Sequence, residues 1–118
     1  MGIKKTLVLH LKKKWFDMVK SGEKKEEYRD ITDYYRSRLF DGWDRVQAGG
    51  LYWYNQQFEK FPQFNFFDNL ILTLGYPKSY DTERRMEFKN PKIRIGTGKP
   101  EWGAEEGKQY FVITWGES

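Results

Sequence analysis

The sequence predicts a single α+β domain, mainly β, with two short helices near its N-terminus. Apolar residues alternate over residues 6–12, recur with helical spacing from residue 13, and later form short runs separated by Gly and Pro. A chain of 118 residues can bury one core without disulfides. We therefore expect one domain that spans residues 1–118.

The first element is a strand over residues 6–12, with the sequence TLVLHLK. Leu7, Leu9 and Leu11 occupy alternate positions, which places them together on one face of a strand. His10, the only histidine, lies on the other face. A lone histidine in this position is more often hydrogen-bonded and structural than catalytic.

A short helix follows the strand. Trp15, Met18 and Val19 fall at i, i+3 and i+4, the spacing of one helical face, with Phe16 beside them. A Ser-Gly pair ends the pattern, with Gly22 where a helix commonly takes a left-handed glycine.

The stretch SGEKKEEYRD, residues 21–30, has six charged residues in the seven positions 23–29. It predicts a strand over residues 24–29 in which neither face is apolar. One interpretation is a solvated surface whose ion pairs contribute about 0–1 kcal/mol. The other is the wall of a polar cleft, in which Glu27 orients Lys24 or Arg29.

The remaining elements are predicted from caps, breaks and apolar runs. Thr32 can cap a second helix that Asp41-Gly42 ends. Strands are expected over residues 69–74, 84–88, 92–96 and 110–115, and the middle two are either separate strands or one long strand broken near Asn90-Pro91. The stretch from 51 to 67 holds eight aromatic residues, which form either a small local core or a base-stacking surface built by Tyr52, Trp53 and Tyr54.

Composition excludes several classes of protein. The chain has no Cys, so a disulfide scaffold and a Cys/His zinc site are both excluded. We expect no cofactor and no metal-dependent activity. No apolar run is long enough to span a bilayer and no signal peptide is apparent, so the expected location is the cytoplasm.

Basic charge is concentrated at the N-terminus. Residues 1–29 contain nine Lys or Arg against four Asp or Glu, although the whole chain carries only +4. Lys12, Lys13 and Lys14 lie where the first helix begins, so they form either an anion site or a set of solvated lysines. A localised basic patch is typical of a phosphate-binding surface.

A glycine-rich stretch, IGTGKPEWG, occupies residues 95–103. Its glycines fit neither a dinucleotide-binding motif nor a P-loop. Lys99, Glu101 and Trp102 remain candidates for the lining of a pocket.

The stretch VLHLKKKWFDMVKSGEKKEEYRD resembles the start of the ASCH domain family of the PUA-like superfamily. The shared pattern is Ser-Gly-x-Lys-x-x-Glu-x-Arg, here Ser21, Gly22, Lys24, Glu27 and Arg29. The segment IRIGTGKPEWGAEEGKQYFVITWG is similar to the end of small bacterial and phage members. The resemblance covers about residues 6–40 and 84–116.

This resemblance implies a small β-barrel with peripheral helices and a cleft lined by the second strand, which binds RNA or nucleotides. One branch is similar to amidohydrolases of N4-acetylcytidine, in which the motif lysine works with a threonine three positions later. Lys24 matches, but Glu27 stands at the threonine position. Another branch is associated with RNA cleavage.

Three hypotheses for the function follow. The first is a module that binds RNA or a modified nucleoside. The second is an enzyme, an amidohydrolase or a ribonuclease with Lys24 and Glu27 as catalytic residues, which a buried Lys24 of lowered pKa would favour. The third is a protein-interaction domain that uses Tyr52, Trp53 and Tyr54 as its exposed anchor. As a surface or cleft residue, Lys24 is expected to contribute little to stability. The candidate ligand-binding residues are His10, Lys12, Lys13, Lys24, Glu27, Arg29, Lys99, Glu101 and Trp102.

Overall fold

The structure, a computed structural model, describes residues 5–42 and 63–116. The expected stacking residues Tyr52, Trp53 and Tyr54 lie outside the described residues. The elements in chain order are β1 (Thr6–Leu11), α1 (Lys13–Lys20), β2 (Glu26–Arg29), α2 (Asp33–Leu39), β3 (Asn69–Leu74), η1 (Thr82–Arg84), β4 (Arg85–Lys89), β5 (Lys92–Thr97), η2 (Pro100–Trp102) and β6 (Gln109–Thr114). No helix in the described part of the chain is long and apolar enough to cross a bilayer.

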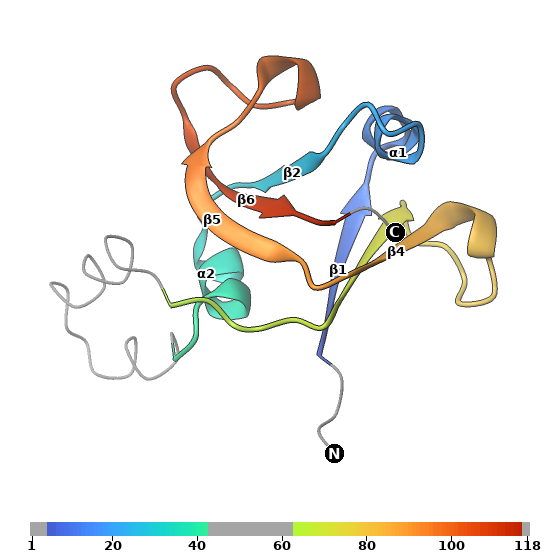
Figure 1. Cartoon of the computed structure of the whole chain (residues 1–118), viewed down its shortest axis with the longest axis horizontal. Coiled ribbons are helices and arrows are strands. Elements are labelled where there is room, and N and C mark those ends of the chain that lie inside the picture. Colours follow the sequence, from blue (N-terminus) through green and yellow to red (C-terminus); the bar gives the residue numbers. More distant parts are fainter. Residues whose placement is uncertain (1–4, 43–62, 117–118) are drawn as a thin grey trace, which may run out of the picture.

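The strands form two three-stranded sheets, ordered β1-β3-β4 and β2-β6-β5 (Figure 1). In the first sheet β1 is parallel to β3, and β4 is antiparallel to β3. In the second sheet β6 is the central strand, antiparallel to both neighbours. The α+β class and the two short N-terminal helices are confirmed, but the expected closed barrel is wrong.

Two local features mark where the sheets meet. Strands β1 and β2 are joined by a side-chain hydrogen bond, which Arg29 Nη2 donates to the His10 carbonyl at 3.0 Å. Between β4 and β5 the chain turns at Asn90, which has a φ of 51°, and at Pro91, which has no N–H to donate to a ladder. The break expected at Asn90-Pro91 therefore separates two strands that belong to different sheets.

One main core fills the space between the sheets and the two helices. Leu7, Leu9 and Leu11 are all buried, as their alternation predicts. In α1 the buried residues are Phe16 and Val19, with Trp15 and Met18 only partly covered, so the buried face is rotated from the predicted one. The other core residues are Leu39, Phe40, Phe67, Leu70, Leu72, Phe111 and Ile113.

The chain leaves α1 through the predicted turn. Gly22 has a φ of 85°, the left-handed conformation that glycine adopts without strain. The Lys24 amide then donates to the Met18 carbonyl at 2.9 Å, which ties the segment to the end of the helix. For this reason β2 begins at Glu26, two residues later than the sequence predicts.

Candidate functional site

A buried ion pair marks the candidate site. Lys24 Nζ donates to Glu27 Oε1 at 2.9 Å, and these residues are only 1 % and 4 % exposed. The expectation that Lys24 is a surface or cleft side chain is therefore wrong. A buried charge without a partner is very costly, so each residue makes the burial of the other tolerable.

Aromatic rings enclose the Lys24 ammonium. It lies 5.3 Å from the ring centroid of Trp15 and 5.6 Å from that of Tyr28. Burial lowers the pKa of Lys24 from its ordinary value, because desolvation disfavours the ammonium more than Glu27 favours it. The sequence pattern around Lys24 is charged, so it does not show that the Trp15 and Tyr28 rings bury this side chain.

Glu27 and Arg29 each keep one buried polar atom without a partner. Glu27 Oε1 accepts from Lys24 and also from the Tyr28 amide at 3.2 Å. Among residues 5–42 and 63–116, its second oxygen, Oε2, has no hydrogen-bond partner, and neither has Arg29 Nε. Arg29 Nη1 lies 3.6 Å from Glu27 Oε1. An unpaired acceptor and an unpaired donor therefore occur on neighbouring side chains.

Both residues line one cavity of about 380 Å³, called the Glu27 cavity below. It lies between the end of β1, strand β2 and the segment that follows β5. Its lining includes acidic and basic side chains, together with the rings of Trp, Tyr and His residues. The lining residues are His10, Leu11, Lys12, Trp15, Glu27, Tyr28, Arg29, Asp30, Trp102, Gly103, Glu105, Lys108 and Tyr110.

The segment after β5 is held over the cavity by close contacts. The Tyr28 hydroxyl donates to Glu26 Oε1 at 2.8 Å and accepts from the Lys99 amide at 2.9 Å. A Cβ on Gly98 would lie 2.5 Å from the Tyr28 ring. A Cβ on Gly103, whose φ is 103°, would lie 2.9 Å from the Trp15 ring. Glycine at both positions allows this segment to approach β2 and α1.

The structure brings some of the predicted residues together and separates others. His10, Lys12, Glu27, Arg29 and Trp102 all line the Glu27 cavity, with Lys24 bonded to Glu27 behind its wall.

The other three predicted residues do not line the cavity. Lys13 instead pairs with Asp17 on the exposed side of α1. Lys99 covers the Trp102 ring, with its ammonium 4.4 Å from the ring centroid, and Glu101 is exposed.

His10 is held by its neighbours in the first sheet. Its Nδ1 lies 2.7 Å from Thr73 Oγ1 and 3.0 Å from the Gly75 carbonyl oxygen. Its ring packs on the Tyr76 ring, with 4.1 Å between the ring centroids. This arrangement fits the structural role expected of a lone histidine.

Sequence analysis missed several lining residues. Asp30 and Lys108 form an ion pair of 3.1 Å at the cavity, and this pair raises the pKa of Lys108. The antiparallel pairing of β2 with β6 brings Asp30, which follows β2, close to Lys108, which precedes β6. The predicted strands over residues 24–29 and 110–115 were the only sequence signal near these residues, and the sequence does not show that the two strands pair.

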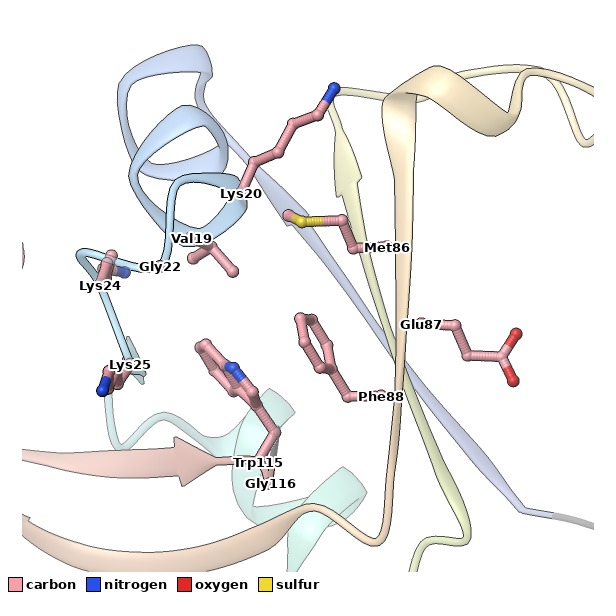
Figure 2. Close-up of a pocket in the computed structure, with 10 residues that line it drawn as sticks. All are labelled: Val19, Lys20, Gly22, Lys24, Lys25, Met86, Glu87, Phe88, Trp115 and Gly116. Atoms are coloured by element: carbon pink, nitrogen blue, oxygen red, sulfur yellow. The ribbon is translucent and has the colours of Figure 1, made fainter. Parts of the chain in front are cut away.

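A second cavity of about 550 Å³ lies between α1, β4 and the segment after β6 (Figure 2). The rings of Phe88 and Trp115 point into it and pack against each other, with 5.2 Å between the ring centroids. Lys24 borders this cavity, but its ammonium is bonded to Glu27. Because neither unpartnered buried atom belongs to its lining, we take the Glu27 cavity as the candidate site.

Within residues 5–42 and 63–116, no cluster of three or more His, Asp or Glu side chains is arranged to hold a metal ion. No family model, curated protein or solved structure matches the chain.

Proposed function

We propose that the Glu27 cavity binds the base of a nucleotide, in RNA or as a modified nucleoside. The observation that carries the proposal is that Glu27 Oε2 and Arg29 Nε, on neighbouring side chains, are both without a hydrogen-bond partner among the described residues. A base edge offers an N–H donor next to an acceptor, and such an edge complements a carboxylate oxygen next to a guanidinium N–H. Buried polar groups left unpaired cost about 1–3 kcal/mol each, which a complementary base would offset.

The other lining residues support the same ligand. Trp15 and Trp102 supply rings against which a flat heterocycle can pack. Lys12 and Lys108 add cations near the opening, while Glu27 and Asp30 keep the lining from being strongly basic. A volume of about 380 Å³ falls within the usual range for a small-molecule site. The resemblance of the Lys24, Glu27 and Arg29 motif to ASCH domains supports the same proposal.

Glu27→Gln tests the proposal, since it keeps the shape of the side chain but removes its charge. Titration of the protein with nucleosides and with short RNA, followed by tryptophan fluorescence, measures affinity. Loss of a charge-assisted hydrogen bond costs about 1.5–3 kcal/mol, so we expect affinity to fall about 10- to 150-fold. Glu101→Gln is the matched control, because Glu101 is exposed and does not line the cavity. Equal affinity of folded Glu27→Gln and wild type would contradict the proposal.

A second candidate is an enzyme that acts on a nucleoside, and the lowered pKa of Lys24 favours it. Against it, the Lys24 side chain is fully enclosed, so a substrate would meet Glu27 first. Glu27 also stands where the amidohydrolases that this motif resembles carry a threonine.

We therefore expect no more than trace hydrolysis of N4-acetylcytidine, measured by chromatography of the products. Robust turnover by the wild type that Lys24→Met removes would make this protein an enzyme.

A further inference from the structure

A third cavity, of about 590 Å³, adjoins the candidate site. His10 and Arg29 line both cavities, so the two share a wall at the junction of β1 and β2. Its other side is formed by Tyr34, Tyr35 and Arg38 of α2 and by Tyr76 after β3. We call this cavity the tyrosine groove.

Two tyrosines of the groove are unusually exposed. Tyr34 is 61 % exposed and Tyr76 is 85 % exposed. Each is nevertheless supported on one side: Tyr76 packs on His10 with 4.1 Å between ring centroids, and Tyr34 meets the edge of Tyr35 at 4.9 Å. A ring that is supported on one side and open on the other is suited to stacking with a nucleic-acid base.

Arg38 supplies the positive charge of the groove. Its guanidinium lies 5.9 Å from the Tyr34 ring centroid. Over the part of the chain that the structure describes, no carboxylate forms an ion pair with Arg38. A half-buried arginine beside exposed aromatic rings matches a phosphate or a base better than it matches an apolar partner.

We propose that the tyrosine groove holds the nucleotide next to the one in the Glu27 cavity, so that the ligand is a single-stranded oligonucleotide and not a free nucleoside. This inference rests on the proposed function of the Glu27 cavity. Tyr34 and Tyr76 stack with the second base, and Arg38 contacts the phosphate. The shared wall formed by His10 and Arg29 makes the two positions continuous.

The test compares the four nucleoside 5′-monophosphates with the four corresponding ribo-tetranucleotides, using the wild type, Tyr34→Ala, Tyr76→Ala and Tyr80→Ala. Tyr80 is the matched control, because it is 77 % exposed but does not line the groove. Circular dichroism confirms that each variant folds. Deoxy-tetranucleotides form a separate arm, which distinguishes RNA from single-stranded DNA.

We expect each tetranucleotide that binds to do so at least about 10-fold more tightly than its monophosphate. One stacked base contributes about 1–3 kcal/mol, so Tyr34→Ala and Tyr76→Ala should each weaken tetranucleotide binding about 5- to 150-fold. Neither change should alter monophosphate binding, and Tyr34→Phe should restore the affinity that Tyr34→Ala loses.

Two results would overturn the inference while leaving the proposed function intact. One is equal affinity for monophosphate and tetranucleotide. The other is a loss in Tyr34→Ala and Tyr76→Ala no larger than that in Tyr80→Ala, which would leave the groove to a different partner such as a protein. If no nucleotide binds at low salt, the proposed function fails and this inference fails with it.

Discussion

Replacing Lys24 with methionine should strongly destabilise the fold. Methionine has nearly the length of lysine and also packs well against the Trp15 and Tyr28 rings, so the change removes the charge with little loss of volume. Glu27 then stays buried with only the Tyr28 amide and a guanidinium 3.6 Å away to compensate its charge. The perturbation thus isolates the electrostatic contribution of the ion pair.

The magnitude follows from the burial of both partners. Removing one member of a buried ion pair typically costs about 3–5 kcal/mol. Because Arg29 still lies near Glu27, we expect a value near the lower end, about 3 kcal/mol. For a domain of this size that corresponds to a fall in Tm of roughly 10 °C. Replacing both partners, as Lys24→Met with Glu27→Leu, should recover part of the loss. Neither member of the pair is then left alone, but Arg29 loses the carboxylate 3.6 Å from its Nη1.

Urea unfolding followed by tryptophan fluorescence gives the free energies for the wild type, both single variants and the double variant. Lys25→Met is the matched control, because Lys25 is the exposed neighbour of Lys24 and should change stability by less than about 0.5 kcal/mol. If Lys24→Met costs no more than Lys25→Met, the ion pair is not a buried, coupled unit and the reasoning fails.

Three further predictions concern the surroundings of the site. Burial raises the pKa of Tyr28 to about 12, whereas the phenol of the unfolded chain ionises near pH 10. The wild type should therefore be more stable than Tyr28→Phe in urea unfolding below pH 10, and this difference should shrink as the pH rises towards 12. A difference that stays constant with pH would contradict this. Gly98→Ala should cost about 1–3 kcal/mol by thermal unfolding because its methyl would overlap the Tyr28 ring, whereas Gly116→Ala, with nothing within 4 Å, should be nearly neutral. RNA affinity, measured by fluorescence titration, should fall as the salt concentration rises from about 50 to about 200 mM. The double variant Lys12→Ala and Lys13→Ala should show a weaker dependence of affinity on salt. An unchanged salt dependence would exclude these lysines as phosphate contacts.

The sequence predicted those parts of the fold that local patterns determine. The alternation of Leu7, Leu9 and Leu11 identified a strand and its buried face, and Gly22 marked the end of α1. Thr32 was expected as a cap, and its hydroxyl accepts a hydrogen bond from the Tyr35 amide. Each of these signals acts over a few residues, so it can be recognised without knowing the tertiary structure.

The parts that failed depend on tertiary contacts that local patterns do not show. Lys24 stands in a charged run, and nothing nearby in the sequence shows that Trp15 and Tyr28 enclose its ammonium. The closed barrel was expected from a family resemblance, whereas the two separate sheets follow from which strands pair, β1 with β3 and β2 with β6. Lys108 was missed because only the pairing of β2 with β6 brings it to the cavity.

The parallel pairing of β1 with β3 has a consequence for how the protein folds. His10 and Thr73, which contact each other across this pair, are separated by 63 positions, and the contact from Lys99 to Tyr28 spans 71. Contacts of such long range require closure of large loops, which slows folding. The helix α1 can form early from local interactions, but the Glu27 cavity cannot exist until β6 has docked beside β2. A nascent chain that has not yet released β6 from the ribosome would therefore have no binding site, and ligand could act only on the completed domain.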